Sequence, residues 1–137
     1  MKALVPLISL AALAGCAAPH QFASPDASWR TRSGQAKYSS GDTTLVGETL
    51  LATRGEKDFV LDFRKGPGIP LLTLQSDGAV TRYSGLLARR GWESAVGAEV
   101  PPHLRVWQRA RTALAGHYPD PLHVAEGVAT VDFLFSR

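Results

Sequence analysis

The chain has 137 residues, 45% of them hydrophobic, with 15 basic and 12 acidic side chains and a formal net charge of +3. This length fits a single domain with one hydrophobic core, and so weak a positive charge argues against nucleic acid as a partner. Cys16 is the only cysteine, which excludes a disulfide within the chain.

The N-terminal residues have the layout of an export signal. A lysine supplies a positive charge, an apolar run extends from Ala3 to Leu13, and small residues precede Cys16. The alternative is a short membrane helix with an incidental cysteine. It fits less well because Pro6 interrupts the run, which is also shorter than the ~20 residues that a spanning helix needs. We predict a signal peptide over residues 1–15, cleaved before Cys16.

The string Leu13-Ala14-Gly15-Cys16 resembles the lipobox of bacterial lipoproteins. The resemblance implies a thioether-linked diacylglycerol on the thiol of Cys16 and a further acyl chain on its amine. Two or more acyl chains anchor a protein stably to a membrane. Ala17 stands where an aspartate would favour the inner membrane, so the resemblance implies anchoring in the outer membrane, with the domain facing the periplasm. No other cofactor is expected.

Residues 16–28 are rich in alanine, serine and proline and show no apolar periodicity. Such a composition is typical of a flexible tether between a lipid anchor and a domain. We expect the folded domain to occupy residues 29–137, beginning at Trp29.

Runs of alternating apolar and polar residues follow, and they predict β-strands separated by turns. The clearest run is Asp58–Arg64, in which Phe59, Leu61 and Phe63 share one face. Asp77-Gly78 is a hairpin signal. The segment Leu86–Trp92 is either a further strand or a covering segment. The other predicted strands are Thr31–Ser39, Thr44–Thr53, Ile69–Gln75 and Ala79–Ser84.

The pattern changes to helical spacing after Pro101-Pro102. Leu104, Trp107 and Leu114 share one face, and Gly116 stands just past the end, which predicts one helix of about four turns. The prolines of the next loop suit neither a helix nor a central strand. The last predicted strand is Val128–Phe135.

These elements predict a mainly β (α+β) fold. We expect a curved, open antiparallel sheet, a half-barrel of about six or seven strands, with one helix packed on its concave face. Trp107 lies in the apolar stripe of that helix, which favours a core position over a place in a lipid groove. For Trp92 both interpretations stay open.

Several strings resemble, in the same order, the family of the outer-membrane lipoprotein receptor LolB and the lipoprotein carrier LolA. They are Trp29-Arg30-Thr31-Arg32, Phe59-Val60-Leu61-Asp62-Phe63, Gly66-Pro67-Gly68, Leu71-Leu72-Thr73-Leu74 and Pro101-Pro102-His103-Leu104-Arg105-Val106-Trp107. The resemblance covers about residues 29–108. It implies a strongly curved sheet with an internal helical lid and an apolar cavity for acyl chains.

Two departures from that family stand out. We expect only one strand after the helix, where the family has several. The turn Lys65–Ile69 has no leucine, whereas the receptor carries an exposed leucine in this loop that helps direct cargo into the membrane. Ile69 is a possible substitute.

No string is typical of a catalytic centre, so we do not expect an enzyme. His117, Asp120 and His123 have loop spacing and lack a fourth ligand, which favours solvated residues over a metal site. A group of arginines either faces anionic head groups or forms a polar rim, and both interpretations stay open. The group consists of Arg89, Arg90, Arg105, Arg109 and Arg111.

Two functions fit these features. In the first, the anchored domain, a monomer, binds acyl chains or other lipoproteins on an apolar concave surface, without chemistry. The residues expected to line that surface are Phe59, Leu61, Phe63, Leu72, Leu74, Leu104, Trp107, Val131, Phe133 and Phe135. In the second, the protein is a structural or accessory envelope lipoprotein that binds another protein through a sheet edge or its basic rim.

Overall fold

The computed structural model describes residues 19–136, so the predicted signal peptide and Cys16 lie outside the described residues. The strands are β1 (Arg30–Ser40), β2 (Thr43–Arg54), β3 (Asp58–Arg64), β4 (Pro70–Ser76), β5 (Val80–Ser84), β6 (Trp92–Ala95), β7 (Leu122–Glu126) and β8 (Ala129–Phe135). The helical segments are two short 3₁₀ turns, η1 (Leu86–Ala88) and η2 (Pro102–Leu104), and the helix α1 (Arg105–Leu114). None of the described helices is long and apolar enough to cross a membrane.

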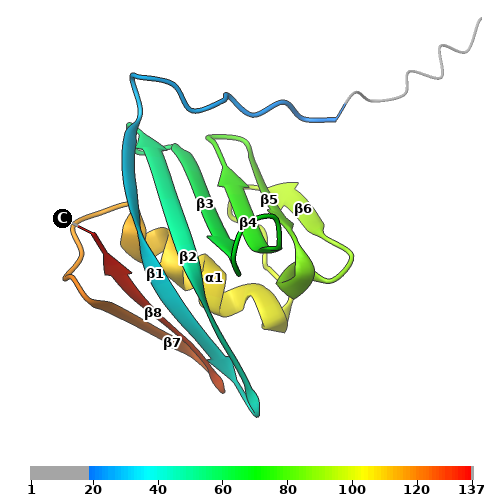
Figure 1. Cartoon of the computed structure of the whole chain (residues 1–137). Helices are drawn as coiled ribbons and strands as arrows, with labels where there is room; N and C mark the ends of the chain where they lie inside the picture. Colours follow the sequence, from blue (N-terminus) through cyan, green and yellow to red (C-terminus); the bar gives the residue numbers. More distant parts are fainter. Residues whose placement is uncertain (1–18, 137) are drawn as a thin grey trace, which may run out of the picture.

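All eight strands form one antiparallel sheet in the order β6-β5-β4-β3-β2-β1-β8-β7. The first six strands follow one another as a meander, and β8 returns to the free side of β1, with β7 outside it. The sheet is open, and Figure 1 shows it curving around α1, which covers one face. The predicted fold class is confirmed.

The structure adds two details to the predicted strands. There are eight strands instead of six or seven, because β7 follows α1 directly and two strands, not one, complete the sheet. The segment Leu86–Trp92 is mostly a covering segment: it contains the turn η1, and β6 begins only at Trp92.

Trp107 is the centre of the packing between α1 and the sheet. Its side chain is fully buried. Its ring centroid lies 5.7 Å from that of Tyr38, 5.6 Å from that of Phe63 and 6.5 Å from that of Phe133. These three rings come from β1, β3 and β8, so one side chain joins the helix to strands on both sides of the sheet centre. Trp107 is a core residue, as its position in the apolar stripe predicts.

Two strand glycines lie where the neighbouring backbone leaves no room for a side chain. A Cβ atom at Gly34 would collide with the backbone oxygen of Leu134, and one at Gly47 would collide with that of Arg64. These glycines lie on the neighbouring strands β1 and β2 and allow the adjacent backbones to approach closely. Any larger residue at Gly34 or Gly47 would therefore force the neighbouring strand backbone to shift.

We expect Trp107→Ala to lower the free energy of unfolding by about 3–5 kcal/mol, because it leaves a cavity between α1 and the sheet. Trp107→Phe should cost less, since it keeps a ring and removes an indole N–H that has no hydrogen-bond partner among the described residues. Urea denaturation followed by circular dichroism measures both. Gln108→Ala, on the next, half-buried position of α1, is the control. An unchanged midpoint for Trp107→Ala would contradict this assignment.

Candidate functional site

The residues expected to face acyl chains form the core of the domain. All of them are between 0% and 4% exposed and belong to one cluster of packed side chains. Phe133 and Phe135, for example, stack with their ring centroids 5.9 Å apart. The structure thus brings the predicted surface residues together, but in contact with one another beneath α1. They leave no open groove between them, and an acyl chain could enter only if α1 moved away.

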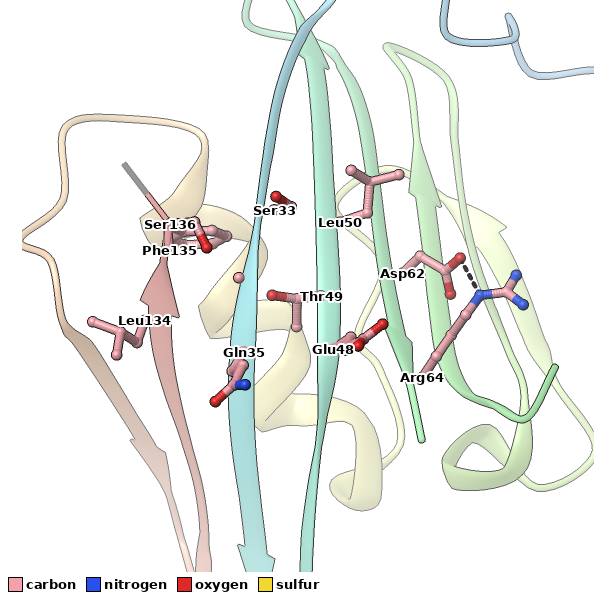
Figure 2. Close-up of a pocket in the computed structure, with 11 residues that line it drawn as sticks. Ser33, Gln35, Glu48, Thr49, Leu50, Asp62, Arg64, Leu134, Phe135 and Ser136 are labelled. Carbon is pink, nitrogen blue, oxygen red and sulfur yellow. Dashed lines mark hydrogen bonds and ion pairs between the residues drawn. The ribbon is translucent and has the colours of Figure 1, made fainter. Parts of the chain in front are cut away.

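A hollow of about 700 Å³ lies on the opposite, outer face of the sheet (Figure 2). Its lining combines polar groups, such as Gln35 and Glu48, with the exposed apolar side chains of Leu50 and Leu134, which are 48% and 58% exposed. Of the residues predicted to face acyl chains, Phe135 alone lines it. Figure 2 shows these side chains projecting from β8, β1 and β2. Such a mixed, open surface is suited to contact with another macromolecule.

One of the two carboxylates that line this hollow, that of Asp62, is already engaged. Asp62 Oδ2 lies 2.6 Å from Arg64 Nε, and Asp62 Oδ1 accepts a hydrogen bond of 3.4 Å from the hydroxyl of Thr73. Figure 2 shows the Asp62–Arg64 pair lying along β3 at the side of the hollow. The carboxylate of Asp62 serves as the partner of an arginine on the outer face of β3.

The loop after α1 is fastened to β1 by Arg32. Its Nη1 donates a hydrogen bond of 2.9 Å to the hydroxyl of Tyr118, and its Nη2 donates one of 3.3 Å to Asp120. The hydrogen bond to Tyr118, followed by the charge of Asp120, raises the pKa of Arg32. The guanidinium also lies over the ring of Phe135, 4.8 Å from its centroid. Asp120 therefore has a structural role.

The histidines and acids of this loop do not assemble as a metal site. His117 is exposed, Asp120 binds Arg32, and His123 pairs with Asp132 across the β7–β8 ladder at 2.5 Å. Within residues 19–136 no three side chains of the usual ligand types come together. The three residues whose loop spacing suggested a metal site therefore have separate surroundings in the structure.

Most of the predicted basic rim is engaged with the domain itself. Arg105 pairs with Glu99, Arg109 pairs with Glu126, and Arg111 lies over the ring of Phe59. Arg89 and Arg90 are exposed and follow η1, whose Leu86 is 67% exposed. The polar-rim interpretation fits the first three arginines.

Residues 19–28, here called the N-terminal strap, run across the end of the sheet instead of leaving it freely (Figure 1). His20 Nε2 lies 2.6 Å from Asp77 Oδ2 in the β4–β5 turn. The backbone oxygen of His20 accepts a hydrogen bond of 3.1 Å from Arg82 on β5, and the Arg82 guanidinium lies over the ring of Phe22 at 4.9 Å. Part of the expected flexible tether is thus attached to the domain. The sequence signal for this attachment is the imidazole of His20, a hydrogen-bonding side chain among the small residues of segment 16–28.

Asp77 is the acceptor at the centre of this attachment. Partial burial raises the pKa of Asp77, but hydrogen bonds from the backbone N–H groups of Val80 and Ala79 and the neighbouring His20 lower it by more, so the pKa lies below its usual 3.8. The N–H donors are 2.9 Å and 2.8 Å from Asp77 Oδ1. The same carboxylate closes the hairpin turn and holds the strap.

A group with a lowered folded-state pKa contributes stability above its unfolded pKa and loses it as the pH falls through the folded value. We therefore expect the strap contact to persist down to about pH 3.8 and to be lost only below it. NMR shifts of the Ala79 and Val80 amides during an acid titration measure this. In His20→Ala the midpoint should move up toward the usual value. A wild-type midpoint at or above 3.8 would contradict the assignment.

The candidate surfaces described above are defined by their geometry alone, because two comparisons with known proteins found no relative. A scan against protein-family models gives no match to this chain, and a search of curated proteins gives none either.

Proposed function

We propose that this protein is a lipid-anchored binding protein of the bacterial cell envelope. The observation that carries the proposal is the string Leu13-Ala14-Gly15-Cys16 behind a short apolar run. In this proposal Cys16 carries the acyl chains, the outer membrane holds them, and the domain faces the periplasm and acts by binding without chemistry. The mature chain is a monomer.

The packing of the domain favours a protein partner over acyl chains. The apolar residues that would receive a lipid are in mutual contact beneath α1, with Trp107, Phe63 and Leu104 fully buried. The accessible features include an outer face with exposed leucines, a hollow at the C-terminal end of α1 and two open sheet edges. We therefore propose that the protein shares the fold of the LolB and LolA family. We do not propose that its domain carries acyl chains.

The strap limits how far the domain can lie from its anchor. His20 is four positions after Cys16, and a fully extended chain of four such steps spans at most ~14 Å. The attached end of the strap lies at β5, near the β6 edge of the sheet. Neighbouring strands are about 4.8 Å apart, so the β7 edge is far from the anchor. We place the β6 side toward the membrane and the β7 side toward the periplasm.

The anchor is tested by metabolic labelling with radioactive palmitate, followed by separation of inner and outer membranes. We expect the label and the outer-membrane fraction for the wild type. Cys16→Ala should lose both, because no thiol remains for the thioether. Ala17→Ser keeps the cysteine and is the matched control. An unlabelled wild-type protein would overturn the proposed anchoring.

The nature of the ligand is tested by native mass spectrometry of the chain from Ala17 onward. Because the core is closed, we expect the mass of the polypeptide alone. A retained mass that disappears on delipidation would contradict binding of a protein partner and restore the acyl-chain function.

A further inference from the structure

The β7 edge of the sheet presents backbone groups that no described strand pairs with. Glu126 pairs with Ala129 in the β7–β8 ladder, so the hairpin loop has only two residues, Gly127 and Val128. In a two-residue hairpin the closing pair exchanges both backbone hydrogen bonds, and such pairs then alternate along the ladder. The backbone N–H and C=O groups of His123 and Ala125 consequently point away from β8. No described strand lies beyond β7 to receive them.

The helix α1 extends the edge into a groove. This β7–α1 groove has a volume of about 540 Å³. Leu122 and Val124, each 7% exposed, contribute its apolar part. The groove is lined by Gln108, Arg109, Thr112 and Ala113 of α1 and by Leu122, His123, Val124 and Ala125 of β7. An added strand could therefore pair with the edge and place alternate side chains against the helix.

A hydrogen bond from Arg109 shows where one backbone carbonyl of the β7 edge points. Arg109 Nη1 donates a hydrogen bond of 3.3 Å to the backbone oxygen of Ala125, so this carbonyl does point into the groove. The Arg109 side chain is 65% exposed, and its Nε lies 2.5 Å from Glu126 Oε2. Of the three arginines of α1, Arg109 alone lines the groove, and α1 has no acidic residue. The charge of this wall is complementary to a partner that brings a carboxylate, which can replace Glu126 at Arg109.

A second copy of this chain fits the edge poorly. Antiparallel pairing of two β7 edges places both helices on the same side of the joined sheet, where α1 already lies beside β7. The two helices would compete for one space. A single extended segment brings no helix of its own. The β6 edge is shorter, with four residues, and lies on the strap side.

We propose that the β7 edge and the β7–α1 groove bind an extended, acidic segment of another envelope protein by strand addition. The segment forms backbone hydrogen bonds with His123 and Ala125, packs alternate apolar side chains against Leu122 and Val124, and directs a carboxylate to Arg109. This proposal rests on the proposed binding role, and it names the surface and the chemistry of the partner.

The probe is a dye-labelled peptide of about ten residues, with valine and threonine alternating around one central glutamate. Fluorescence anisotropy measures its binding to the mature protein in detergent micelles. Ala125→Pro removes an outward N–H that the β8 ladder does not use, and it should weaken binding roughly tenfold. Ala125→Val keeps that N–H and should bind the peptide more tightly than Ala125→Pro does. Ser94→Ala, on β6 at the opposite edge of the sheet, is the control with unchanged affinity. Arg109→Gln should reduce the preference for glutamate over lysine at the centre of the peptide.

Hydrogen exchange locates the contact. We expect the peptide to slow exchange in β7 and not in β6. Equal affinity of the wild type and Ala125→Pro, absence of binding, or protection of β6 instead would overturn the proposal. Protection of β7 without peptide that grows with protein concentration would also overturn it and indicate a second copy. Peptide binding by a protein that carries no palmitate would leave this site standing while the proposed anchor fails.

Discussion

The contact between Trp107 and the three rings of Tyr38, Phe63 and Phe133 determines how the rest of the domain is arranged. A single helix of 10 residues must cover the concave face of an eight-stranded sheet. A large aromatic side chain fills much of that space at once and contacts strands that are distant in sequence. Gly34 and Gly47 let neighbouring strand backbones approach closely, and the sheet curves around this one helix. The core is therefore filled by the protein itself.

The alternation of apolar residues was sufficient to predict most of the fold. The strand Asp58–Arg64 has the predicted bounds, and the helix ends at Leu114 before the predicted Gly116 stop. These signals are local: period-two alternation and helix-terminating residues act within a few positions. The strand β7 escaped prediction because it has only five residues between a proline-rich loop and Gly127, and two of them, His123 and Ala125, are exposed.

The candidate site was harder to predict for a different physical reason. The pattern correctly indicated which side chains face the helix, including Phe59, Leu61 and Phe133. Lining a cavity and filling a core require the same residue types in the same order, and the difference lies in whether side chains from α1 meet those of the sheet. Whether the side chains of α1 and of the sheet are in contact depends on the tertiary packing, which the order of residues in one strand or helix does not reveal. The strap contacts are also tertiary, since His20 and Asp77 are 57 positions apart in the sequence.

If Cys16 carries the proposed lipid anchor, the strap provides two different lengths of linker between the lipid and the domain. While His20 and Phe22 remain attached to Asp77 and Arg82, only a few residues lie between the lipid and the domain. If those contacts open, the whole segment up to Trp29 becomes available as linker. About ten further residues, fully extended, add up to roughly 35 Å of reach. A few side-chain contacts at one end of the sheet thus determine how far from the proposed anchor the opposite edge can lie.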